Sequence, residues 1–97
     1  MYNIKMIWDE DKREKVIRER NIDFAEILDI FDDPFAVDFQ DLEHSTADEA
    51  RYKIIGITAY YGLITLVYTI SDSQDKFITA WKSDEWETNE YEQNKKW

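Results

Sequence analysis

The sequence predicts an α+β fold in which helices flank an antiparallel sheet, and two observations carry this prediction. Residues 51–82 read as three consecutive strands of β-branched, aliphatic and aromatic side chains, joined by turns short enough for antiparallel hairpins. Residues 24–31 instead repeat apolar side chains at the spacing of an amphipathic helix. The expected architecture is an antiparallel sheet built on a three-strand meander, with two N-terminal helices and a C-terminal helix.

The first part of the chain is expected to form an edge strand and a surface helix. Residues 3–8 are largely apolar and suit an edge strand added to the meander, and Asp9 suits the cap of a helix that follows. That helix has acidic residues early and Arg18 and Arg20 late, the order that the helix dipole favours, and Asn21 can stop it in a left-handed conformation. Because it is charged almost throughout, it is expected at the surface.

A second helix is predicted from apolar residues at i, i+3, i+4 and i+7, which are Phe24, Ile27, Leu28 and Phe31. Asp23 can cap it, and Glu26 lies three residues further on, as in a capping box. The helix should end at residues 32–34, because proline cannot continue the backbone ladder. Residues 35–39 then alternate like a strand, and the polar residues 40–50 are expected to form a loop.

The meander and the C-terminal helix complete the prediction. The two turns of the meander are expected at residues 60–62 and 71–75. After it, Ser83 can cap a helix whose first turn is acidic and which ends in Lys95 and Lys96. One face of this helix carries only a thin apolar stripe, so partial docking is expected; its residues are Trp86, Glu90, Gln93 and Trp97.

Length and composition predict one domain over residues 1–97. With 97 residues, 43% of them hydrophobic, the chain can build one core. The absence of cysteine excludes disulfides, thiolate catalysis and cysteine-ligated metal sites. No apolar run reaches the length of a membrane span and no signal peptide is recognisable, so a cytoplasmic protein without membrane attachment is expected. No cofactor or bound metal is expected.

The negative charge of the chain belongs to its first half. Residues 1–50 hold 15 acidic and 6 basic side chains, a net charge of −9, whereas residues 51–97 hold 7 and 6, a net charge of −1. A strongly negative protein repels phosphate backbones, which argues against general nucleic-acid binding. A local face of the sheet can escape this objection, since the second half is nearly neutral.

Two groups of side chains before the meander could carry chemistry. His44 is the single histidine, and near carboxylates it could act as a general base or as one metal ligand; the alternative is a loop histidine that bonds to the backbone. No second histidine exists to complete a zinc set. Asp32 and Asp33 could bind a cation, but beside a proline such residues more often end a helix.

The basic residues attached to the predicted sheet are Arg51, Lys53 and Lys82. On RNA they would bind phosphate or stabilise the charge of a transition state. The alternative is charge that keeps strands soluble and protects their edges. The aromatic residues of the same region could stack on bases or lie in the core; they are Tyr52, Tyr60, Tyr61, Tyr68 and Trp81.

Read together, these segments resemble the BrnT family of type II toxin-antitoxin systems, whose fold is similar to that of the RelE toxins. The resemblance runs from about Ile7 to Tyr91 and rests on the order of several short motifs. They are Trp8-Asp9-Glu10 with Lys12, Phe31-Asp32-Asp33-Pro34, His44-Ser45, Glu49-Ala50-Arg51-Tyr52, Ile55-Gly56 and Val67-Tyr68-Thr69.

The resemblance implies a toxin that cuts RNA without metal and inhibits translation, and a BrnA-like antitoxin that binds it. In that family operator DNA is bound through the toxin–antitoxin complex. By position, Arg51 matches an arginine at the start of the central strand, and Lys82 matches a basic residue after the last strand. His44 is the candidate base. The chain departs from the family pattern at residues 19–21, where a histidine is lost, and at Trp81, which replaces an arginine.

Three functions follow as hypotheses. The first is a BrnT-like ribonuclease toxin that acts through Arg51, Lys82 and His44. The second is a binding module of the same fold with weakened catalysis, whose acidic N-terminal half binds a basic protein partner. The third is a likeness of fold alone, with an unrelated ligand.

Overall fold

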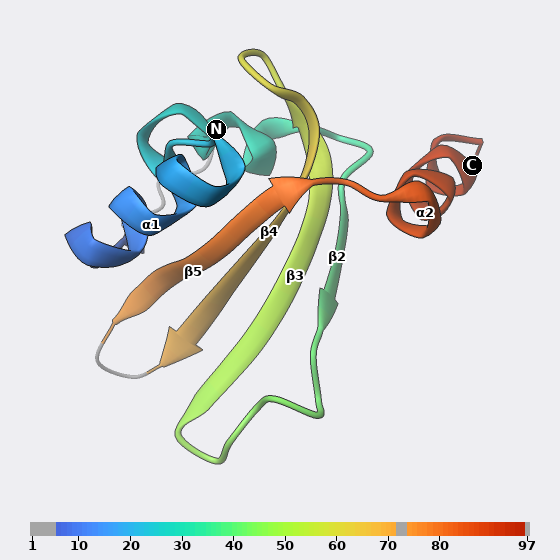
Figure 1. Cartoon of the computed structure of the whole chain (residues 1–97). Coiled ribbons are helices and arrows are strands. Elements are labelled where there is room, and N and C mark those ends of the chain that lie inside the picture. The colour runs from blue at the N-terminus through green and yellow to red at the C-terminus, as the bar shows by residue number, and fades with distance from the viewer. Residues whose placement is uncertain (1–5, 72–73, 97) are drawn as a thin grey trace.

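The computed structural model describes residues 6–71 and 74–96, and its centre is a five-stranded sheet in the order β1-β5-β4-β3-β2 (Figure 1). Strands β2 to β5 pair antiparallel, and β1 pairs parallel with the edge of β5. The strands are β1 (Met6–Ile7), β2 (Val37–Gln40), β3 (Glu49–Thr58), β4 (Gly62–Ser71) and β5 (Asp75–Lys82). The helices are α1 (Glu10–Arg20), the 3₁₀ helices η1 (Phe24–Glu26) and η2 (Leu28–Asp32), and α2 (Glu85–Lys95).

The predicted meander is present as β3, β4 and β5, but the antiparallel sheet has four strands rather than three, since β2 pairs with β3. The strand expected at residues 35–39 begins two residues later, at Val37. Of the edge strand expected at 3–8, Met6 and Ile7 pair with β5, and residues 3–5 lie outside the described residues. Gly62 closes the first hairpin at φ +76°, a conformation that favours glycine. The second turn includes residues 72 and 73, which also lie outside the described residues.

Helix α1 begins and ends where the sequence predicts. The carboxylate of Asp9 accepts a hydrogen bond from the backbone N–H of Asp11 at 2.8 Å. Asn21 ends the helix in the left-handed conformation, with φ 59° and ψ 35°. Val16 is the buried residue of this helix, in agreement with its expected place at the surface.

The second N-terminal helix was predicted wrongly as one continuous α-helix. The structure has two short 3₁₀ helices that meet at Ile27. Phe24, Ile27 and Ile30 are fully buried, a spacing of three residues that matches the three residues per turn of a 3₁₀ helix, whereas Leu28 is 47% exposed. The carboxylate of Asp23 caps η1 as predicted, by accepting from the N–H of Ala25.

The hydrophobic core lies between these helical segments and one face of the sheet, which we call the packed face. Its buried members are Val16, Ile22, Phe24, Ile27, Ile30, Ile54, Ile64, Leu66, Tyr68, Phe77 and Ala80. Because side chains alternate along a strand, the residues between them on β3 and β4 point to the opposite face.

Helix α2 lies apart from α1 (Figure 1), and it packs mainly against β2 and β3 of the sheet. Its cap is Asp84 rather than Ser83, because Asp84 and Glu87 form a reciprocal capping box. The prediction that the apolar stripe is the face of α2 that docks on the sheet is also wrong. The helix buries Glu87 and Tyr91, whereas Trp86 is 58% exposed and Trp97 lies outside the described residues.

Candidate active site

The face of the sheet opposite the packed face carries three basic residues. Arg51 pairs with Thr69, and Thr69 pairs with Lys76, in a row across β3, β4 and β5. In the adjoining row, Lys53 pairs with Val67. Directly paired residues project on the same side of a sheet. We call Arg51, Lys53 and Lys76 the cationic face.

The basic residues of the cationic face are free to bind an anion. None of the three forms an ion pair within residues 6–71 and 74–96. Three cations thus gather on one face of a chain whose net charge is −10, although the charge of Lys53 also acts on the nearby carboxylate of Asp41. This local arrangement meets the objection that the overall charge raises against phosphate binding.

His44 is held at the edge of the cationic face by Asp41. Its Nδ1 lies 2.8 Å from Oδ2 of Asp41, and its backbone N–H donates to Oδ1 of the same residue at 3.3 Å. Burial raises the pKa of Asp41, but the hydrogen bonds from His44 and the charge of Lys53 outweigh it, so this pKa lies below its ordinary value. An ionised carboxylate can only accept, so Nδ1 carries the hydrogen and Nε2 is left as an acceptor.

The loop that carries His44 is fixed to the start of β3. The hydroxyl of Ser45 donates to the carbonyl of Asp41 at 2.7 Å and accepts from the N–H of Arg51 at 2.9 Å. The N–H of Asp41 donates to the carbonyl of Arg51 at 2.7 Å. The structure therefore fixes the loop that carries His44 to the backbone of Arg51, two residues that the sequence singled out.

Two buried polar atoms of the Arg51 row have no hydrogen-bond partner in the described part of the chain. They are Nε of Arg51 and Oγ1 of Thr69. A buried polar group without a partner costs about 1–3 kcal/mol. Such groups occur at sites that bind a ligand, because a phosphate oxygen can accept the hydrogen bonds that the protein leaves unmade.

Trp81 joins the cationic face to α2. Its Nε1 donates to the carboxylate of Glu87, at 2.9 Å to Oε1 and 3.2 Å to Oε2. Nζ of Lys53 lies 5.9 Å from the centroid of the Trp81 ring. Trp86 of α2 meets Phe39 edge-to-face, with ring centroids 6.4 Å apart. Aromatic rings beside basic side chains are the combination that binds single-stranded nucleic acid.

Lys82 lies on the other side of the sheet. It pairs with Ile64, a residue of the packed face. Ile64 pairs with Gly56, five residues along β3 from Arg51, which is a separation of roughly 17 Å along the strand. The structure thus does not bring Lys82 and Arg51 together.

Asp33, Tyr52 and Tyr68 have structural roles. The carboxylate of Asp33 accepts from the N–H groups of Phe35 and Ile57 and from the hydroxyl of Tyr91. Tyr68 lies in the core and stacks on Tyr52, with ring centroids 5.5 Å apart. Asp33 therefore fits the interpretation of a helix-ending turn.

Sequence reasoning missed Asp41, Thr69 and Lys76 as members of the site. Asp41 stands three residues before His44, a spacing at which an aspartate can accept from the following backbone. Lys76 comes onto the cationic face only because β5 contains a bulge opposite Val67 and Tyr68. That irregularity leaves no clear mark in the sequence.

The described residues, 6–71 and 74–96, contain no group of three or more histidine, aspartate or glutamate side chains arranged to hold a metal ion. None of their helices is long and apolar enough to cross a membrane.

Comparison with known proteins places this chain in a family. Residues 8–87 match the family model described as the ribonuclease toxin BrnT of type II toxin-antitoxin systems. No curated protein matches the chain. The match spans most of the sequence and includes every residue of the cationic face, together with Asp41 and His44. The chain therefore belongs to the BrnT family of ribonuclease toxins of type II toxin-antitoxin systems.

Proposed function

We propose that this protein cleaves RNA on the cationic face, with His44 as general base and Arg51 on the scissile phosphate. The observation that carries the proposal is the Asp41–His44 pair, 2.8 Å apart, on a loop hydrogen-bonded to the backbone of Arg51. Membership of a ribonuclease toxin family supports the choice of RNA as substrate.

The cleavage can be written with the groups of the site and water. Nε2 of His44 takes the proton of a 2′-hydroxyl, whose oxygen attacks the neighbouring phosphorus. The bond to the 5′-oxygen breaks, and that oxygen takes a proton from water. Arg51, with Lys53 and Lys76, stabilises the added negative charge on the phosphorus oxygens. The products are a cyclic phosphate and a free 5′-hydroxyl, and no metal is required in this proposal.

Several wider expectations follow from the same proposal. Cleavage of mRNA would inhibit translation, in the manner of the RelE-like toxins. Type II toxins have an antitoxin partner, which we propose to be a BrnA-like protein that also carries the complex to operator DNA. A cytoplasmic site of action fits this role. Lys82 can contribute only where RNA reaches the end of β5, because it lies on the other side of the sheet from Arg51.

The proposal is tested by incubating purified protein with an RNA oligonucleotide and following the products. Wild type should release fragments that end in a cyclic phosphate. Arg51→Ala and His44→Ala should each lower the rate on the order of 100-fold. Lys96→Gln, a change of an exposed cation at the C-cap of α2, is the control and should leave the rate unchanged. Intact RNA with the wild-type protein, or full activity of Arg51→Ala, would show that the proposal is wrong.

A second candidate is a binding module with weakened catalysis, and Trp81 is the observation that favours it. This residue stands where the family resemblance implies an arginine, and its indole donates to Glu87 instead of offering a cation. Loss of one donor from a charge-stabilising site costs on the order of 100-fold in rate. The acidic first half of the chain would then bind a basic protein partner.

This alternative predicts slow or absent cleavage together with a stable complex. Affinity for the basic partner should fall steeply as salt rises, because the attraction is between exposed charges. Activity gained by Trp81→Arg in the RNA assay would support the weakened-enzyme interpretation. A complex whose affinity does not change with salt would count against it.

A further inference from the structure

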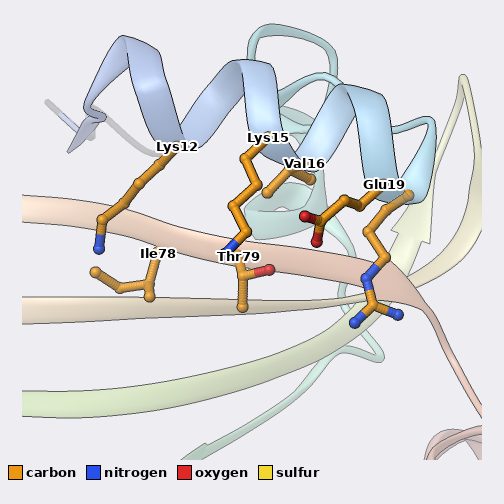
Figure 2. Close-up of a pocket in the computed structure, with 7 residues that line it drawn as sticks. Lys12, Lys15, Val16, Glu19, Ile78 and Thr79 are labelled. Atoms are coloured by element: carbon orange, nitrogen blue, oxygen red, sulfur yellow. The ribbon is translucent and has the colours of Figure 1, made fainter.

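A groove between α1 and β5 is lined by basic side chains of α1, which belongs to the acidic half of the chain. Figure 2 shows Lys12 and Lys15 extending from α1 toward Ile78 and Thr79 of β5. Arg20 also lines the groove, and among the described residues Glu19 is the carboxylate that borders it. The described residues that line the groove are Lys12, Lys15, Val16, Glu19, Arg20, Ile78 and Thr79. We call this the α1 groove.

The cations of the α1 groove are not used by the fold. Arg13, on the neighbouring side of the helix, donates to Asp23 at 2.7 and 2.9 Å and to Glu10 at 3.1 Å. Lys12, Lys15 and Arg20 form no ion pair within the described residues. Their charges therefore remain available to an anionic ligand.

The α1 groove continues toward the cationic face around the end of β5. A second hollow is lined by Glu19, Arg20, Trp81, Lys82 and Asp84. Glu19 and Arg20 line both hollows, and Trp81 borders Lys53 of the cationic face. The basic side chains from Lys53 past Lys82 to Lys12 thus border one connected path, which also passes the carboxylates of Glu19 and Asp84.

We propose that this path binds the backbone of single-stranded RNA that extends from the cleavage site, an inference that rests on the proposed ribonuclease function. The ligand is single-stranded because it has to turn around the edge of the sheet, which a stiff duplex does not do over so short a distance. Phosphates along the strand meet Lys82, Arg20, Lys15 and Lys12 in turn. Lys82 thus acts as a binding residue rather than at the reacting phosphate.

The test compares the double variant Lys12→Gln/Lys15→Gln with the control Arg18→Gln/Lys96→Gln, which removes equal charge at exposed positions outside the groove. Binding is measured by fluorescence anisotropy with 2′-O-methyl RNA, which cannot be cleaved, in a short and a long form over a range of salt. Each phosphate contact adds about 0.7 to the slope of log affinity against log salt for a single strand. The groove variant should therefore lose about 1.4 from that slope with the long RNA.

Cleavage of a dinucleotide with free 2′-hydroxyls, which is too short to reach the α1 groove, separates the two proposals. The groove variant should bind long RNA on the order of tenfold more weakly than the control variant at moderate salt, and it should cleave a dinucleotide at the wild-type rate. Unchanged binding of long RNA would show that the α1 groove does not bind RNA, and it would leave the cleavage proposal intact. Groove-dependent binding without any cleavage by wild type would overturn the cleavage proposal alone. If the variant loses an acidic protein partner and keeps its affinity for RNA, the groove is a protein docking site and the inference is wrong.

Discussion

The hydroxyl of Tyr91 donates a hydrogen bond to Oδ2 of Asp33 at 2.7 Å, which joins α2 to the turn after η2. The same oxygen accepts from the N–H of Ile57 at 2.8 Å, and Oδ1 accepts from the N–H of Phe35 at 2.9 Å. Burial raises the pKa of Asp33, but these hydrogen bonds and the charge of Lys95 lower it below the ordinary value of 3.8. One carboxylate therefore connects η2, the end of β3 and α2.

Asp33→Asn should destabilise the protein by about 1–3 kcal/mol, because an amide cannot accept all three hydrogen bonds. A lowered pKa in the folded state gives stability that is fully present above the ordinary pKa and is lost as pH falls through the folded value. The free energy of unfolding, measured with urea from neutral to acidic pH, should thus fall more steeply below about pH 4 for wild type than for Asp33→Asn. Asp32→Asn, at the exposed neighbour, is the control and should follow wild type. Parallel pH curves for all three proteins would contradict this role of Asp33.

Gly56→Ala should destabilise the protein through crowding. A Cβ at this position would lie 2.8 Å from Cγ1 of Ile30 and 3.3 Å from Cβ of Ala36. Overpacking of this kind costs about 1–3 kcal/mol. The cost should shrink in an Ile30→Ala background, because that change removes the clashing carbon. A double-mutant cycle by chemical unfolding measures this coupling, and strictly additive effects would show that the contact with Ile30 is not the cause.

The strands could be predicted from the sequence because their signals are local, whereas the form of η1 and η2 depends on contacts made far along the chain. Residues 24–31 contain spacings of three and of four, and the sequence does not say which is buried. The carboxylates of Asp29 and Asp33 accept from the N–H groups of Ala59 and Ile57 at the end of β3. These bonds fix the segment against the sheet, so tertiary structure overrides the helical pattern.

The residue types of the candidate site could be predicted from the sequence, but their arrangement in space could be predicted only in part. Arg51 and His44 stand out as a strand cation and the single histidine. The backbone link between their segments depends on Ser45, whose hydroxyl donates to the carbonyl of Asp41 and accepts from the N–H of Arg51. Regular pairing would set Thr69 opposite Phe77, and the bulge in β5 sets it opposite Lys76 instead.

Thr69→Val should leave the folded protein as stable or make it more stable, by up to about 1 kcal/mol, because the buried hydroxyl has no partner in the described residues. Thr65→Val is the matched control on the same strand and the same face. Its hydroxyl lies 3.0 Å from Oγ of Ser83, so this change should destabilise by about 1 kcal/mol. Thermal unfolding followed by circular dichroism compares the two variants. Equal destabilisation by both would contradict the assignment of an unpartnered hydroxyl to Thr69.

Asp41→Asn should lower RNA cleavage while the fold is kept. An amide oxygen can still accept from the backbone N–H of His44, but an uncharged amide no longer stabilises the imidazolium that forms when Nε2 takes a proton. The cleavage rate should fall on the order of 100-fold, which is the typical contribution of a general base. Glu43→Gln removes the same charge from an exposed position of the same loop and should have little effect. Single-turnover cleavage of a saturating RNA oligonucleotide separates the chemical step from binding. An equal loss in both variants would mean that the charge of the loop, and not the Asp41–His44 contact, sets the rate.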